Sequence, residues 1–265
     1  MNYHRIRVMI EKEWAEVFKN RMVVFTMVLL PVIFTALPLV ILSAINASGT
    51  LPAGSTADVP ETYLKLCGNA PAGDCMQIYI MTEFMLMFMM MPVILPTTFA
   101  AYSIVGEKTT RTLEPLLATP ISTAELLTAK ALAAALPSVG LSWLSFAVFL
   151  AGLPLVKASA GLVHYVTGPV WLLAVIVLGP LLAIASVNLS VIVSSRVNDP
   201  RAAEQISAVL IVPVLLVLFA QLAGLFVLNT ALIFAAILVV VVADLGLTYA
   251  GVQLFQREAI LTQWK

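Results

Sequence analysis

Few residues of this chain have the types and spacing that catalysis or metal binding needs. The two histidines, His4 and His164, are far apart in the sequence, and neither has a second candidate ligand beside it in an apolar segment. The patterns H-E-x-x-H, G-x-S-x-G and G-x-x-x-x-G-K-[ST] do not occur. These are the signatures of a zinc-protease helix, a serine nucleophile and a phosphate-binding loop. We therefore expect no catalytic residue, no metal site and no cofactor bound by this chain.

The two cysteines have the spacing for a disulfide bond. Seven residues, including Gly, Pro and Asn, lie between Cys67 and Cys75. Residues of these types allow a chain to turn back on itself. We expect the disulfide to form if this segment faces an oxidising compartment. The alternative is two free thiols in a flexible loop.

Two acidic residues lie within long apolar segments. An acidic side chain deep in a bilayer costs about 2.5–3.5 kcal/mol, so it should face protein or water. Asp244 is the deeper of the two, and Glu83 is close enough to a span end to reach water. Both are candidates for a substrate pathway. The alternative for Asp244 is a protonated helix contact, which Thr248 one turn away could satisfy.

Methionines recur at helical spacing, at Met81, Met85 and Met89. Thioether sulfurs are soft ligands that select Cu(I). They also make an adaptable apolar surface. Because no Cys or His accompanies them in the same segment, the sequence favours the apolar surface.

The elements that position these residues must cross a membrane. Hydrophobic residues make up 61% of the 265 residues and charged residues 11%. In soluble domains, roughly 45–50% of the residues are hydrophobic and about 25% are charged. The net charge is zero, so the composition gives no reason to expect nucleic-acid binding. We expect one all-α membrane domain over residues 1–265.

Stretches without Lys or Arg locate the spans. A membrane helix needs about 20 residues, and the longest stretch, between Arg201 and Arg257, has room for two. An amphipathic, basic segment over residues 1–21 predicts a helix on the membrane surface, or one packed on a partner protein. The six predicted spans are at about residues 22–45, 78–105, 130–153, 169–193, 206–228 and 231–253.

The positive charges predict the orientation in the membrane. Of the 14 Lys and Arg residues, 12 fall on one side of the predicted spans, and the other side has only Lys65 and Lys157. Loops rich in Lys and Arg stay in the cytoplasm. We therefore expect a multi-pass protein of the cell membrane, with both termini cytoplasmic and both cysteines outside.

The predicted cytoplasmic loop at residues 106–129 contains a short helix. Thr112 can cap it, and Thr119 ends it because the next residue is proline. Its apolar face carries Leu113, Leu116 and Leu117. An exposed apolar face of this size indicates a protein partner.

This loop resembles that of the permease subunits of type-2 ABC transporters, which are half-size exporters with six spans per chain. Their common pattern is similar to E-K-E-x-G-T-L-E-x-L-L-x-T-P, followed by a polar residue and E-L-L-x-x-K. Arg111 departs from it, because the common pattern has Gly there. The matching residues are Glu107, Lys108, Thr112, Leu113, Glu114, Leu116, Leu117, Thr119, Pro120, Glu125, Leu126, Leu127 and Lys130.

The resemblance implies partners for this chain. In that family the short helix is a coupling helix that docks in a groove on a separate ATPase subunit. Two permease chains, as a homodimer or a pair of similar chains, join two cytosolic ATPase subunits that hold ATP and Mg. The residues implied to couple to the ATPase are Glu107, Thr112, Leu113, Glu114, Leu116, Leu117, Thr119 and Pro120.

The predicted function is therefore the permease subunit of an ATP-driven exporter. The first alternative is an ion-coupled secondary transporter that works without an ATPase, with Glu83 or Asp244 as its proton or cation site. Such transporters often contain internal repeats, and none is evident here. A membrane enzyme and a membrane scaffold are further alternatives. A lipid, a hydrophobic drug-like molecule or an ion would each fit as substrate.

Overall fold

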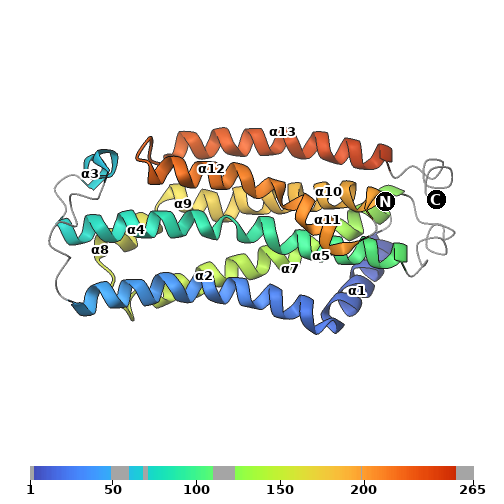
Figure 1. Ribbon diagram of the computed structural model, residues 1–265, viewed down its shortest axis with the longest axis horizontal. Helices are drawn as coiled ribbons and strands as arrows, with labels where there is room; N and C mark the ends of the chain where they lie inside the picture. The colour runs from blue at the N-terminus through green and yellow to red at the C-terminus, as the bar shows by residue number, and fades with distance from the viewer. Residues whose placement is uncertain (1–2, 49–59, 68–70, 110–122, 198, 255–265) are drawn as a thin grey trace.

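The computed structural model describes residues 3–48, 60–67, 71–109, 123–197 and 199–254, which form a bundle of helices without any β-strand in these ranges (Figure 1). Six helical stretches are long and apolar enough to cross a membrane, which confirms the predicted all-α fold with six spans. They are Val23–Ala47, Gly73–Ser103, Glu125–Gly152, Ala160–Arg196, Pro200–Leu222 and Thr230–Leu254.

The first three spans consist of long helices, with a further helix before the first span and a short helix between the first and the second. Helix α1 (Tyr3–Lys19) precedes α2 (Arg21–Ser48), which is the first span. A short helix, α3 (Glu61–Cys67), follows. The second span is the pair α4 (Ala72–Phe88) and α5 (Met91–Thr109), and the third is α7 (Thr123–Gly152).

The last three spans are interrupted by other helix types. The fourth contains α8 (Ala160–Val166), α9 (Pro169–Leu173), the π-helical turn η1 (Ala174–Leu178) and α10 (Gly179–Arg196). The fifth contains α11 (Pro200–Ser207), the 3₁₀ turn η2 (Ala208–Leu210) and α12 (Ile211–Leu222). The sixth is α13 (Thr230–Leu254).

The fifth span differs from the predicted residues 206–228 at both ends. It begins at Pro200 because the Asp199 side chain caps α11, accepting a hydrogen bond from the Arg201 backbone N–H at 2.8 Å. It ends at Leu222 because Gly224, with φ of 69°, leaves the helical conformation two residues later.

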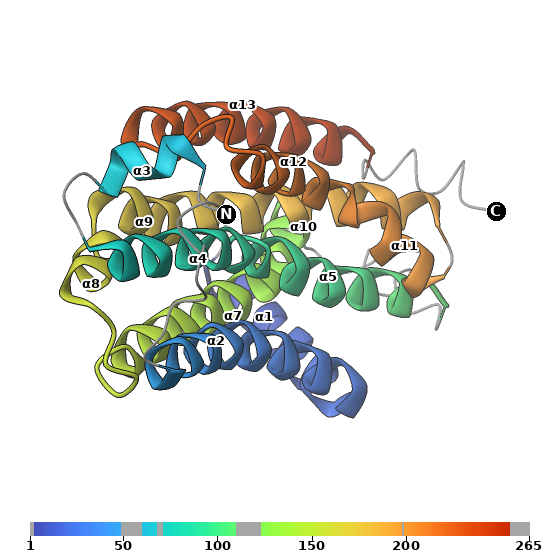
Figure 2. The same ribbon diagram turned by 60° about the vertical axis from the view of Figure 1, so that its left-hand side comes forward.

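The bundle has two distinct ends. One end, here called the α1 end, holds α1, α11, the end of α5, the start of α7 and the end of α13 (Figures 1 and 2). The opposite end, here called the α3 end, holds α3 and α8. By the predicted orientation, the α1 end would face the cytoplasm.

The helix pair α4–α5 forms the centre of the bundle and is buried along most of its length. The predicted methionine surface lies here: Met81, Met85 and Met91 are fully buried. The Phe88 ring packs on Phe149, with 5.5 Å between the ring centroids. These methionines therefore fill space between helices, which suits their flexible side chains.

Helix α4 breaks from α5 at Met89 and Met90. The cause is Pro92, the second residue of α5, because proline has no N–H and its ring clashes with the preceding turn. The sequence predicted one span here, at about residues 78–105, with prolines that can kink it.

The helices α2, α12 and α13 are mostly exposed. On α13 the buried residues are Ile233, Asp244 and Gly251, and large side chains such as Leu238 and Leu245 are about two-thirds exposed. Exposed apolar faces of this length are typical of helices that contact lipid or a second chain.

Candidate functional site

Helix α1 packs lengthwise against the beginning of α7. Ile6 and Met9 of α1 form a small apolar cluster with Leu126 and Ala129 of α7. One turn further along α7, the Trp14 indole N–H donates a hydrogen bond to the Ala133 carbonyl at 2.9 Å. The α1 helix is therefore fixed to the first three turns of α7.

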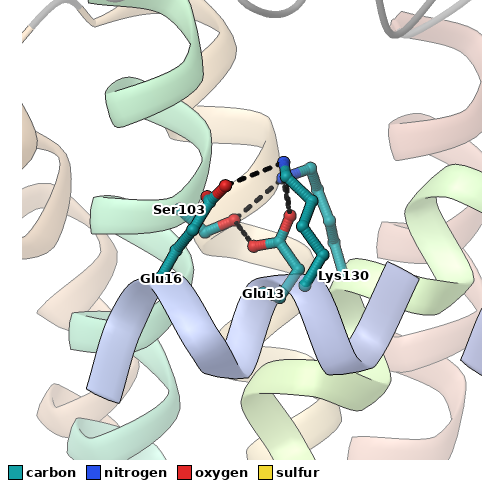
Figure 3. Close-up of polar contacts among 5 residues, drawn as sticks. Glu13, Glu16, Ser103 and Lys130 are labelled. Carbon is teal, nitrogen blue, oxygen red and sulfur yellow. Dashed lines mark hydrogen bonds and ion pairs between the residues drawn. The ribbon is translucent and has the colours of Figure 1, made fainter. Parts of the chain in front are cut away.

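A buried polar cluster connects α1, α5 and α7, and we call Glu13, Ser103 and Lys130 the Glu13 triad (Figure 3). Lys130 Nζ lies 2.8 Å from Glu13 Oε1 and 2.8 Å from Ser103 Oγ. The Ser103 hydroxyl donates to Glu13 Oε2. Glu13 is only 1% exposed and Lys130 6%, so this ion pair is inside the protein.

The Glu13 triad joins the two helices that flank residues 110–122. Ser103 lies in the last two turns of α5, which ends at Thr109. Lys130 lies two turns into α7, which begins at Thr123. Since Glu13 bonds to both, α1 braces the two stems of the segment in which the sequence predicts the coupling helix.

The charge on Glu13 is stabilised despite its burial. Burial raises the pKa of the Glu13 carboxyl, but the Lys130 ammonium and the hydrogen bonds from Lys130 and Ser103 outweigh it, so the net pKa is below the ordinary value. Lys12 Nζ adds a second, partly exposed cation 3.8 Å from Glu13 Oε1. The triad therefore holds an ionised Glu13 at neutral pH.

A weaker ion pair lies at the start of α1. Arg5 Nη1 is 3.9 Å from Glu125 Oε2, and Glu125 is in the first turn of α7. Acidic side chains are favourable at a helix N-terminus, where the backbone dipole is positive. Glu125 thus stabilises the start of α7 and also contacts α1.

Most of the predicted coupling residues lie outside the described residues. Glu107 is in the last turns of α5, and nothing is known of its side chain. The others, Thr112, Leu113, Glu114, Leu116, Leu117, Thr119 and Pro120, fall in the undescribed segment 110–122. The structure shows the stems of this segment and the brace between them.

Glu83 and Asp244, the candidate pathway residues, are not brought together. Glu83 lies in α4 near the α3 end, where its Oε1 accepts a hydrogen bond from the Tyr63 hydroxyl at 3.2 Å. Asp244 lies in α13 towards the α1 end, 8% exposed, with no hydrogen-bond partner for either carboxylate oxygen among the described residues. Thr248 does not bond to Asp244, and its hydroxyl instead accepts a hydrogen bond from the Asn188 side-chain amide at 3.0 Å.

Cys67 and Cys75 form a disulfide, the pairing that their spacing predicts, with 5.5 Å between the Cα atoms. Cys67 is the last residue of α3, and Cys75 is in the first turn of α4. The bond therefore fixes one end of α3 to the second span.

A cavity of about 290 Å³ lies at the α1 end between α2, α5 and α11. The Thr98 hydroxyl donates to the Glu204 carboxylate on its wall. The lining residues are Thr26, Thr98, Tyr102, Arg201, Glu204 and Gln205. Its hydrogen-bonding groups and two opposite charges could contact the polar part of a substrate.

The sequence analysis missed Glu13, although the sequence contains a signal for it. The buried residues of α1 are Ile6, Met9, Glu13 and Val17, which recur every three or four residues. A charged residue at that spacing lies on the apolar face of a helix and needs a buried partner. Lys130 and Ser103 could not be chosen as partners from the sequence, since they are 117 and 90 residues away.

Comparison with known families finds a match along nearly the whole chain. The model of a family described as ABC-2 family transporter protein matches residues 7–258. No curated protein matches the chain.

Proposed function

We propose, from the premise that this chain belongs to the ABC-2 transporter family and is the permease subunit of an ABC transporter, that two copies of it form an exporter driven by separate ATPase subunits. The two ATPase subunits would bind ATP and Mg and dock against the segment between α5 and α7. Export through the cell membrane is the proposed direction.

The observation that carries this proposal is the Glu13 triad. A movement of residues 110–122 would be transmitted to the membrane-spanning helices through α5 and α7. Because Glu13 bonds to Ser103 and Lys130, the two helices cannot separate at this level without exposing a buried ion pair. Breaking a buried ion pair strongly destabilises a protein, because it leaves a charge without compensation. The two stems and α1 would therefore move as one body when the ATPases close.

The candidate pathway begins at the α1 end. Helix α11 forms one wall of the cavity that contains Arg201 and Glu204, and its partner wall is α2. Movement of α5 relative to α11 would change this cavity, because Thr98 of α5 bonds directly to Glu204 of α11. Substrate would enter here and leave at the α3 end.

The direct test is transport by the purified chain in proteoliposomes, with and without its ATPase partner. We expect substrate movement to require ATP and to stop when the Walker A lysine of the ATPase is replaced by alanine. Collapse of the proton and sodium gradients should leave the rate unchanged. Transport that persists without the ATPase and follows an ion gradient would instead identify a secondary transporter.

Asp244 provides a test of the pathway on α13. We propose that its carboxylate contacts substrate or a water-filled path, because it is buried and has no described protein partner. Asp244→Asn keeps the shape and removes the charge, and we expect transport about tenfold slower, the loss of one charge-assisted contact. The matched control is Thr248→Val, one turn along α13, which should transport normally. Full activity of the Asn variant would show that transport does not need the Asp244 charge and that this residue only contributes to packing.

A further inference from the structure

At the α3 end, the short helix α3 connects two spans that are distant in sequence (Figure 2). Its last residue, Cys67, is bonded to Cys75 of α4. Near its other end, the Thr62 hydroxyl donates a hydrogen bond to the Gly224 carbonyl at 3.1 Å, just past the end of α12. Helix α3 is thus attached covalently to α4 and by hydrogen bonds to α12.

Tyr63 is the centre of this attachment. Its side chain is fully buried, and its ring lies edge-on against Tyr79 of α4, with 4.9 Å between centroids. Its hydroxyl donates to Glu83 Oε1 at 3.2 Å and accepts from Gln221 Nε2 at 3.1 Å. Burial and the Glu83 charge raise the pKa of the Tyr63 phenol, so its proton stays in place. A hydrogen-bonded bridge therefore runs from α4 through α3 to α12.

The bridge leaves two acceptors without partners among the described residues. They are Glu83 Oε2 and Gln221 Oε1, on side chains that are 9% and 0% exposed. A buried acceptor without a partner favours any state in which it reaches water or another donor. Separation of α4 from α12 would give both oxygens access to water.

Helix α12 contacts the bundle along one face, where Val214, Leu215 and Val217 are partly buried against the core beside Leu218. Its buried residues are Leu218 and Gln221, one turn apart. The rest of the helix is partly or fully exposed, including Leu216 at 64% and Phe219 at 60%. Loss of the bridge at Gln221 would leave the Thr62–Gly224 hydrogen bond as the described polar contact between α3 and this end of α12.

The contact between α3 and α12 depends on Gly224. Its φ of 69° is in the left-handed region, and a Cβ there would lie 2.7 Å from the Pro60 Cβ. Only glycine permits both this turn and this approach. The chain therefore brings α3 into closer contact with the end of α12 than any other residue at position 224 would allow.

We propose that α3 is a gate at the far end of the transport path, closed by the Glu83–Tyr63–Gln221 bridge and tethered to α4 by the Cys67–Cys75 disulfide. The proposal rests on the transport function above, since a permease must open at this end to release its substrate. When the bridge breaks, the disulfide keeps α3 on α4 while α12 moves away. Tyr63 and Gln221 are thus positioning residues.

The gate can be tested by thiol labelling of Leu218→Cys. Position 218 is buried one turn below Gln221, and both natural cysteines are in the disulfide, so the new thiol is the one free target. A membrane-impermeant thiol reagent is added from the side that α3 faces. Tyr63→Phe removes only the bridging hydroxyl and with it both hydrogen bonds of the bridge, and we expect labelling at least about tenfold faster, since each bond is of ordinary strength. Gln221→Leu should give the same result.

The matched control is Tyr79→Phe, which makes the same chemical change in the ring next to Tyr63 without touching the bridge. It should label at the original rate. Replacing both cysteines with serine should also speed labelling, because α3 then loses its tether. Unchanged labelling in both Tyr63→Phe and Gln221→Leu would overturn the gate.

These outcomes separate the gate from the transport proposal, because labelling needs neither ATP nor an ATPase. Faster labelling in the bridge variants supports the gate even if transport proves to be driven by ions. ATP-driven transport together with unchanged labelling would reject the gate and leave the exporter function in place.

Discussion

Lys130→Met should lower the free energy of unfolding by about 3–5 kcal/mol, the usual cost of leaving a buried charge without its partner. Lys130 supplies two of the three hydrogen bonds within the Glu13 triad, and Glu13 is 1% exposed, so the orphaned carboxylate could not reach water without moving α1. The measurement is unfolding in detergent or lipid, followed by helix content or by proteolysis of α1.

Two controls show whether the loss comes from the orphaned charge. Lys12→Met removes a lysine of α1, next to Glu13, whose ion pairs are partly exposed, and it should cost no more than about 1 kcal/mol. The double variant Glu13→Leu/Lys130→Met replaces both charges with apolar groups, and it should recover most of the loss. A double variant as unstable as Lys130→Met would show that the loss of stability comes from altered packing and not from the orphaned charge.

The same ion pair gives the fold a defined acid sensitivity. The folded pKa of Glu13 is below its ordinary value, so its stabilising effect is complete above the ordinary carboxyl pKa of about 4.3. The effect is lost as the pH falls from there through the folded value. We expect the double variant to lack this loss, since it has no carboxyl at position 13.

The spans were predictable because each rests on local composition. A membrane helix needs about 20 apolar residues, and five long gaps between Lys and Arg residues, the longest with room for two helices, predict the six spans. The interruptions were harder to predict. The sequence contains many prolines within spans, and Pro31, Pro38, Pro96 and Pro137 lie inside continuous helices. Pro92 and Pro180, in contrast, are the second residues of α5 and α10, where a turn or a π-helical segment interrupts the span.

The polar clusters were unpredictable in their pairing. Glu83 and Asp244 were recognisable as acids within the spans, although Glu83 was expected to reach water and is buried. Tyr63 and Gln221 are 158 residues apart, and no local pattern joins them. The sequence analysis missed Glu13 because it lies in a basic, amphipathic helix, where charged residues are expected. In each case the sequence indicates that a side chain needs a partner, and only the packing of distant helices selects it.

Leu116→Asp/Leu117→Asp should abolish recovery of the ATPase with the permease. The sequence predicts a short helix whose leucine face docks on the ATPase, so the double variant would bury two charges without partners. At about 3–5 kcal/mol for one such charge, the affinity should fall more than about a hundredfold. Purification through a tag on the permease, followed by quantification of the ATPase, measures this directly.

Docking and folding are separable here, because α5, α7 and α1 are held together by the Glu13 triad and the α1–α7 contacts, independently of the leucine face. The Asp variant should therefore insert and unfold like the parent. The matched control is Thr109→Asp/Thr110→Asp, which adds the same charge to the same connection before the predicted helix, and it should still recover the ATPase. If the leucine variant binds the ATPase and transports normally, these leucines are not the docking surface, and the proposed coupling through residues 110–122 is wrong.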